Sequence, residues 1–212
     1  MEIYNSEQDQ VDALKAWWDK NGRITIVAII AVLLGVLGWK SWMQNQEQRA
    51  EAASLQYQQM LDTLEAAPSQ AMELGRSIVG EYPKSTYAVF ASLAMAKIAV
   101  EQSDLDAAAA HLTVAMNQAG EEAIEQMARL RLARVLHAQG KGDKALGLLN
   151  VDTTSGFRGG YDELRGDILL SQGQSDAARD AYINALNGFS DAPEKKRLVQ
   201  MKLNDLSESQ SE

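Results

Sequence analysis

The strongest constraint in this sequence is an apolar run near its beginning, which reads ITIVAIIAVLLGVLGW over residues 24–39. The run contains no charged or amide side chain, and Arg23 and Lys40 stand at its two ends. A helix of this length rises about 24 Å, and its extension to Met43 gives about 30 Å, which matches the hydrocarbon core of a bilayer. Lys40 can reach the headgroups from within such a helix. The run is therefore long enough to cross a membrane once.

All four tryptophans of the chain flank this run, in two pairs. Indole side chains favour the membrane–water interface, and a helix from Trp18 to Trp39 rises about 31 Å, so each pair would lie at one headgroup layer. We therefore predict a membrane anchor over residues 24–43. Its anchoring side chains are Trp17, Trp18, Ile24, Trp39 and Trp42.

Two other interpretations of the run have less support. A buried core helix seldom combines this length with aromatic flanks. A cleaved signal peptide has a shorter polar beginning than residues 1–23, and the nearest small-x-small pattern, Ala50-Glu51-Ala52, lies beyond the usual cleavage distance. We interpret the run as an uncleaved signal anchor.

The basic residues around the anchor predict its orientation. Lys15, Lys20 and Arg23 precede the run, whereas only two basic residues follow it closely. Because basic flanks stay on the cytoplasmic side, we expect residues 1–23 to form a short cytoplasmic head. The larger remainder would then face the opposite side of the membrane, which the chain crosses once.

The composition of this remainder excludes several classes of function. From Gln44 onward there are 24 acidic and 16 basic residues, a formal charge of −8 that disfavours nucleic acid as a partner. The chain contains no cysteine, which excludes disulfides, iron–sulfur clusters, thiol nucleophiles and cysteine zinc sites.

The chain after the anchor has the pattern of successive amphipathic helices, with no alternating strand pattern. No proline or glycine occurs between Lys40 and Pro68, so the anchor helix can continue into the following domain. The alternative is a kink in the helix near residues 44–48. A first helical pair can be placed with Ala71 as its small residue, but Gly75 stands where a large apolar residue is expected. We predict an all-α chain.

A repeat is visible in the second helix of each later pair, where a small residue precedes a larger apolar one by four positions. Ala108, Ala145 and Ala178 mark these positions, at spacings of 37 and 33 residues. This period and pattern resemble tetratricopeptide repeats, in which small residues let paired helices cross closely. The helix breaks between the pairs fall at Ser103, Gly140 and Gly173, and the last unit fits the pattern best, with Gly166, Leu169, Gly173, Ala178, Tyr182, Ala185 and Leu186.

The resemblance implies an α-solenoid of three to four helix pairs. The helix from Pro193 to Leu206 has apolar residues on one face and is expected to cap it. The predicted organisation is a cytoplasmic head over residues 1–23, the anchor over 24–43, a tetratricopeptide-like domain over 44–206 and a disordered tail over 207–212.

Catalytic chemistry is not expected. His111 and His137 stand in separate predicted helices, without a second ligand at the spacing of metal sites. The segment 140–143, Gly-Lys-Gly-Asp, lacks the full phosphate-loop pattern and a preceding strand, so it predicts a turn. We therefore expect no enzyme, no cofactor and no metal.

The first helices of stacked pairs line a concave surface that suits an extended peptide or a partner helix. Apolar contacts on it are expected to give affinity, and mixed charges little sequence preference. The predicted lining is Phe90, Leu93, Lys97, Glu101, Met127, Leu130, Arg134, His137, Glu163 and Asp167.

The whole arrangement is similar to the YfgM family of inner-membrane proteins. The resemblance is carried by the opening residues through WWDKNGR, the tryptophan-flanked run, the segment LQYQQML and the junction EYPKS. It implies an ancillary subunit of the SecYEG translocon in a bacterial inner membrane, with the domain of residues 44–206 in the periplasm. It also implies a partner, a membrane-anchored prolyl isomerase of the PpiD kind, and a role in passing emerging or unfolded polypeptides to periplasmic chaperones. It also implies that the head restrains an Rcs-type response regulator in a stress response. The alternative that the sequence leaves open is a structural scaffold of another envelope complex, without chaperone activity.

Overall fold

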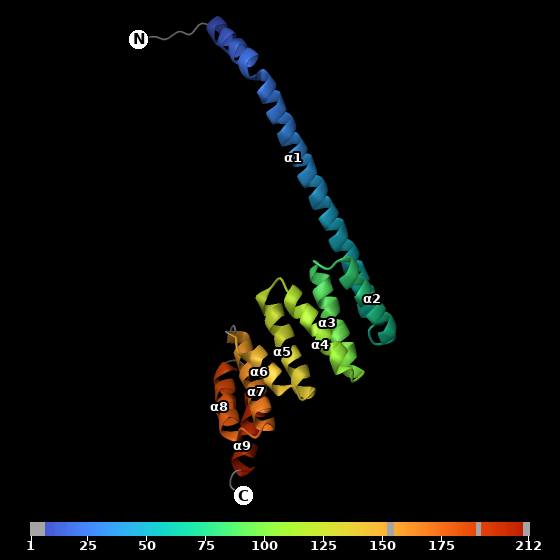
Figure 1. Cartoon of the computed structure of the whole chain (residues 1–212), viewed down its shortest axis with the longest axis vertical. Coiled ribbons are helices and arrows are strands. Elements are labelled where there is room, and N and C mark those ends of the chain that lie inside the picture. Colours follow the sequence, from blue (N-terminus) through green and yellow to red (C-terminus); the bar gives the residue numbers. More distant parts are fainter. Residues whose placement is uncertain (1–6, 152–154, 190–191, 210–212) are drawn as a thin grey trace, which may run out of the picture. The chain divides into compact units, whose positions relative to one another are not determined.

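The computed structural model describes residues 7–151, 155–189 and 192–209, and within these ranges all regular secondary structure is α-helical (Figure 1). The chain divides into two compact units, Met1–Glu51 and Ala52–Glu212. The predicted all-α class is confirmed. The helices are α1 (Glu7–Thr63), α2 (Pro68–Glu81), α3 (Thr86–Glu101), α4 (Leu105–Gln118), α5 (Glu122–Ala138), α6 (Gly142–Leu149), α7 (Ser155–Ser171), α8 (Ser175–Gly188) and α9 (Pro193–Ser209).

In the first unit, α1 exposes its apolar side chains instead of burying them. Ile24 is 72% exposed, and none of the apolar segment that is long enough to cross a membrane is buried within the protein. The ring centres of Trp17 and Trp18 lie 6.4 Å apart, and those of Trp39 and Trp42 lie 5.6 Å apart. Such a surface fits a lipid environment, because in water all of this apolar area would be exposed to solvent.

Helix α1 continues through residues 44–48, where the sequence left a kink open. Its last residues belong to the second unit, in which Ala53 and Met60 are fully buried. The helix that carries the predicted anchor therefore also supplies the first helix of the repeat domain.

The turns between paired helices repeat one geometry. Ser103, Gly140 and Gly173 have φ angles of 62°, 74° and 76°, in the left-handed region that ends helices. The residue after each donates its backbone N–H to the carbonyl oxygen five positions earlier, at 2.8–2.9 Å, which satisfies an unpaired helix-end carbonyl. The three predicted breaks are thus confirmed.

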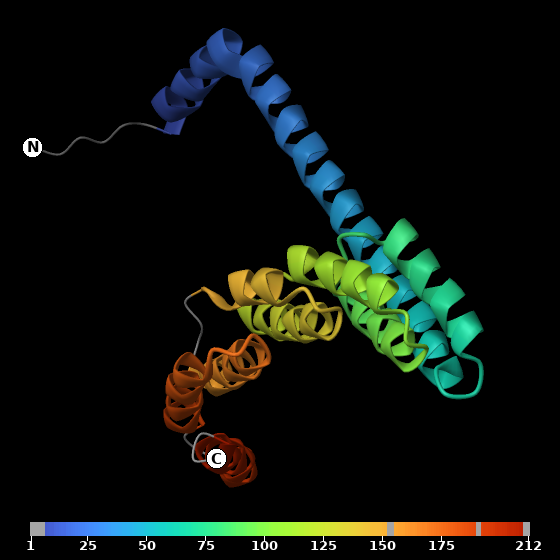
Figure 2. The ribbon, with the colours of Figure 1, turned by 60° about the horizontal axis from the view of Figure 1, so that its bottom comes forward.

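Small residues lie where paired helices cross. The second helices α4, α6 and α8 each run beside the preceding first helix of their pair (Figure 2). Ala108, Ala145 and Ala178 in these second helices are fully buried. In those first helices Ala96 is 3% exposed and Ala133 fully buried. Alanine on both sides lets the helix axes approach closely, so the fold is the tetratricopeptide-like solenoid that the sequence predicts.

The last pair crosses on glycine instead of alanine. A Cβ atom added to Gly166 of α7 would lie 2.5 Å from ring carbons of Tyr182 in α8. The earlier units have leucine where the last has Tyr182, and Tyr182 itself is 1% exposed. The larger ring therefore requires the smaller residue opposite it.

The first pair departs from the pattern at Gly75 of α2. A Cβ atom there would lie 2.7 Å from the side chain of Met95 and 3.1 Å from that of Met60. Two methionines thus fill the space that a large apolar residue occupies elsewhere, because their flexible side chains adapt to irregular gaps.

Helix α9 covers the end of the solenoid. Val199, Leu203 and Leu206 are buried in one cluster with Tyr182 and Phe189. The helix extends to Ser209, so residues 207–209 of the predicted tail are helical. Residues 210–212, like residues 1–6 of the predicted head, lie outside the described residues.

Candidate interaction groove

A groove with a volume of about 400 Å³ lies between the first helices α3 and α5, and we call it the α3–α5 groove. Most of its lining is apolar, and Leu112 of α4, which is 2% exposed, contributes to it from the helix behind. Apolar walls with a few charged groups at the edge are typical of peptide-binding surfaces. The lining consists of Leu93, Ala96, Lys97, Val100, Glu101, Leu112, Arg131, Arg134 and Val135.

The repeat explains why these side chains converge. Lys97 and Arg134 are 37 residues apart, which is the spacing of the small-residue positions Ala108 and Ala145. Equivalent positions of successive repeats share one face of the solenoid. The charged side chains at the edge of the groove are therefore set by the same periodicity that sets the core.

Most of the charge at this edge is basic. Lys97 and Glu101 form an exposed ion pair at 3.6 Å, which leaves the pair neutral. Arg131 and Arg134 are exposed, and within the ranges that the structure describes neither has a hydrogen bond or ion pair. The α3–α5 groove thus has two uncompensated guanidinium groups in an acidic domain.

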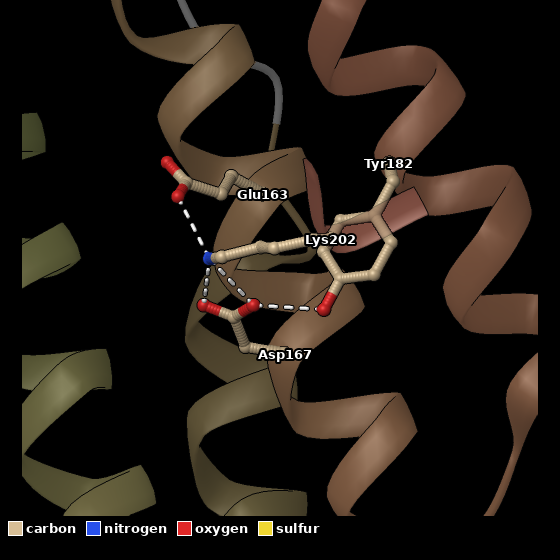
Figure 3. A network of polar contacts seen from close by, with 4 residues as sticks. All are labelled: Glu163, Asp167, Tyr182 and Lys202. Atoms are coloured by element: carbon tan, nitrogen blue, oxygen red, sulfur yellow. Dashed lines mark hydrogen bonds and ion pairs between the residues drawn. The ribbon is translucent and has the colours of Figure 1, made fainter. Parts of the chain in front are cut away.

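A second cluster of charges lies at the C-terminal end of the solenoid (Figure 3). The Nζ of Lys202 in α9 donates to Glu163 Oε1 at 2.8 Å and to the two carboxylate oxygens of Asp167 at 2.8 and 2.9 Å. Tyr182 of α8 donates its hydroxyl to Asp167 at 2.8 Å. These contacts join α7, α8 and α9 through one network.

The network shifts two ionisation equilibria. Burial alone would lower the pKa of Lys202, but the hydrogen bonds to Asp167 and Glu163 outweigh it and raise that pKa above its ordinary value. Burial, together with the hydrogen bond to Asp167, raises the pKa of Tyr182. Both groups keep their protons more tightly in the folded protein than in the unfolded chain.

Comparison with known proteins places the chain in a family. The model of the tetratricopeptide repeat-like domain matches residues 15–208. The ancillary SecYEG translocon subunit of Escherichia coli strain K12 is 33% identical over 208 residues, which cover 98% of this chain and 100% of that protein. The chain belongs to this family of ancillary SecYEG translocon subunits. The resemblance to the YfgM family is thereby confirmed.

A second relative agrees with this assignment. The ancillary SecYEG translocon subunit of Haemophilus influenzae is 32% identical over 200 residues, covering 94% of this chain and 97% of that protein. The crystal structure of a thermophilic TPR protein of Thermus thermophilus matches 71% of this chain and 81% of that one, at 19% identity and a TM-score of 0.49.

The structure brings together four of the side chains predicted to line a groove, namely Leu93, Lys97, Glu101 and Arg134. Phe90 and Met127 are half-buried and pack against the core cluster of α3, α4 and α5, and the ring of Phe90 lies 6.0 Å from that of Tyr57 in α1. His137 is half-buried near the end of α5.

Three of the predicted lining residues lie outside the α3–α5 groove and have other neighbours. Leu130 is buried at 9% exposure in the cluster of α5, α6 and α7, because a side chain that points between repeats packs on the next one. Glu163 and Asp167 are bound by Lys202, so α9 occupies the surface that the repeat pattern left free.

The sequence also contained a signal that the periodicity argument missed. Arg131 lies three residues before Arg134 and four after Met127, which places all three on one helix face. Lys202 had no comparable signal, because its partners are 35 and 39 residues away in sequence.

Outside the α3–α5 groove and the network around Lys202, the remaining candidates for a site are side chains that could bind a metal or titrate near neutral pH. Among the described residues, no group of three or more histidine, aspartate or glutamate side chains could hold a metal ion. Burial, and next the charge of Arg76, lowers the pKa of His111, whereas Asp104 raises it in part. His111 is thus a half-buried neutral side chain of α4 near neutral pH.

Proposed function

We propose that this chain is a membrane-anchored protein-interaction module at the Sec translocon, which receives emerging polypeptides and passes them to periplasmic chaperones. The observation that carries the proposal is the end-to-end match to proteins named for the SecYEG translocon. The α3–α5 groove supports it, because an apolar surface with charged edges suits unfolded chains of varied sequence. The module acts by binding and without catalysis.

The anchor contributes by raising the local concentration of the repeat domain beside the translocon. A domain tied to the bilayer beside a translocon meets each emerging chain at an effective concentration that free diffusion does not reach. Weak contacts in the α3–α5 groove are then sufficient for capture, and they allow the chain to leave again. This agrees with an open groove whose lining includes exposed Val100 and Lys97.

The topology belongs to the proposal. Residues 1–23 lie in the cytoplasm, residues 24–43 cross the inner membrane, and residues 44–206 lie in the periplasm. Protease added to spheroplasts with sealed membranes is expected to remove the repeat domain. Protection of that domain would place it inside the cell and contradict the topology.

We propose two further partners, which the resemblance to the YfgM family implies. A membrane-anchored prolyl isomerase of the PpiD kind would share clients with the repeat domain, and an Rcs-type response regulator would bind the head. Purification from mild detergent, with identification of bound proteins, tests both. Loss of the regulator alone on removal of residues 1–23 is the expected result, and its retention would contradict the assignment to the head.

A pair of matched variants tests the groove. Val100 lies in the α3–α5 groove and is 44% exposed, while Ile183 on α8 is 45% exposed and lies outside it. We expect Val100→Glu to reduce capture of a translocation intermediate several-fold, and Ile183→Glu to leave capture unchanged. Equal effects of the two substitutions would remove the groove from the proposal.

A light-scattering assay separates this function from that of a structural scaffold. The full chain in detergent is expected to suppress the aggregation of a denatured secretory protein, and Val100→Glu to weaken the suppression. A fixed stoichiometric complex together with no suppression would instead identify a scaffold.

A further inference from the structure

The edge of the α3–α5 groove differs in charge from the domain around it. From Gln44 onward acidic residues outnumber basic ones by 24 to 16, yet the groove lining contains Lys97, Arg131 and Arg134 against Glu101 alone. A basic site in an acidic domain attracts anionic ligands and repels cationic ones, whereas the acidic surface around it does the reverse.

Among the described residues, Arg131 and Arg134 lack partners, unlike several other arginines of the domain; Arg76 and Arg197 are unpaired too, but they lie outside the groove. Arg129 is paired with Glu125, and Arg165 with Asp162. Within the described ranges, Arg131 and Arg134 have no such contact, and the pair between Lys97 and Glu101 uses the only acidic side chain of the lining. Two guanidinium groups are thus available to a ligand beside apolar walls.

We propose that the groove selects polypeptide segments in which carboxylates at alternate positions stand next to an apolar anchor residue. The inference deepens the proposed function and depends on it. Apolar side chains of the segment pack on Leu93, Val100 and Val135, and its carboxylates pair with Arg131 and Arg134. The mixed charges in the sequence predicted little sequence preference, and the proposed selectivity for acidic segments differs from that prediction.

The spacing of the two arginines fits an extended segment. Residues three apart on a helix have Cβ atoms about 5–6 Å apart. Alternate residues of an extended chain lie about 6.7 Å apart and point to the same side. Two carboxylates separated by one residue can therefore each meet one guanidinium group, which binds them in a planar, two-pronged geometry.

The test uses the full chain in nanodiscs of phosphatidylcholine, a zwitterionic lipid without net charge, and three fluorescent peptides with blocked ends. The peptides share length and apolar residues and carry glutamate, glutamine or lysine at two alternate positions. We expect the glutamate peptide to bind about tenfold more tightly than the lysine peptide at low salt. The difference is expected to shrink in 0.5 M salt, since exposed charges are screened.

Substitution of the arginines should invert this order. Arg131→Glu with Arg134→Glu is expected to favour the lysine peptide, and Arg131→Gln with Arg134→Gln to remove the preference. The matched control is Lys144→Glu with Arg197→Glu, which changes the net charge equally at exposed positions outside the groove and is expected to keep the original order.

The outcomes separate the two proposals. Equal affinities for the three peptides, or a preference that survives in the arginine variants, would overturn the charge selectivity and leave a groove that binds polypeptides. Absence of binding by every peptide would overturn both proposals. A dimer of the chain that requires Arg131 and Arg134 would show that a second copy is the occupant and would also overturn the inference.

Discussion

The central and C-terminal parts of the repeat domain use the same repeat position in opposite ways. Lys97, Arg134 and Asp167 are separated by 37 and 33 residues, the spacings of the repeat itself. The first two lie at the edge of an open groove, whereas Asp167 is bound by Lys202 and Tyr182. Periodicity thus tells where a side chain lies, and the capping helix decides whether a partner can reach it.

The helix crossings show the same contrast. Ala96 and Ala133 occupy the small position in the central units, and leucines stand at the facing repeat position. In the last unit Gly166 and Tyr182 replace them. The hydroxyl that the tyrosine brings is what reaches Asp167, so the altered crossing and the occupied carboxylate form one structural feature.

The largest expected effect comes from making the last crossing like the central ones. In Gly166→Ala the new methyl group overlaps the buried ring of Tyr182, which can move only by disturbing the core. We expect a loss of about 2–3 kcal/mol in the free energy of unfolding, measured by urea denaturation.

Two variants sharpen this result. Addition of Tyr182→Leu to Gly166→Ala restores the alanine–leucine pairing of the central units and should recover part of the loss. Gly147→Ala on α6, where no atom lies within 4 Å of the added Cβ, should stabilise by about 0.5–1 kcal/mol. An equal loss at both glycines would refute the steric explanation.

The ion pairs provide a second test. Lys202→Met leaves Glu163 and Asp167 without their cation, at side-chain exposures of 15% and 31%, and is expected to cost about 1–2 kcal/mol. The matched change Lys97→Met breaks a pair exposed at 59% and 57% and should cost less than about 0.5 kcal/mol. Similar costs would mean that α9 does not depend on this network.

Alkaline pH tests the network without a change in packing. The raised pKa values of Lys202 and Tyr182 stabilise the folded state below about pH 10, where both groups are protonated in the unfolded chain as well. This contribution to stability is lost as the pH rises through the pKa values that the two groups have in the folded protein. The free energy of unfolding should decrease between pH 8 and pH 11. This decrease should be about 1 kcal/mol smaller in Tyr182→Phe than in the original chain.

The smallest effect concerns the turns. Ser103 holds a left-handed φ of 62° where the later units have glycine. Ser103→Gly is expected to stabilise by about 0.5 kcal/mol, and Gly140→Ser to destabilise by about 0.5–1 kcal/mol. Thermal unfolding measures both, and a change of the same sign in the two variants would contradict the equivalence of these turns.

The sequence predicts the features that depend on local pattern. The apolar run, the small residues at Ala108, Ala145 and Ala178, and the breaks at Ser103, Gly140 and Gly173 all follow from spacing within one or two helices. These features are sufficient to predict a helical repeat domain behind an anchor.

The features that the sequence does not predict depend on contacts between distant segments. The burial of Leu130 on the next repeat and the pairing of Lys202 with Glu163 join residues that no periodic argument relates. The open groove at Lys97 and Arg134 is equally a result of which surfaces α9 leaves uncovered.

Site-specific photocrosslinking in secreting cells tests the central claim most directly. A photoreactive amino acid placed in turn at the equivalent positions Lys97, Arg134 and Asp167 samples the open groove and the capped end in otherwise identical chains. We predict capture of translocating polypeptides at Lys97 and Arg134 and little capture at Asp167. Capture at Asp167 alone, or at none of the three positions, would contradict the account.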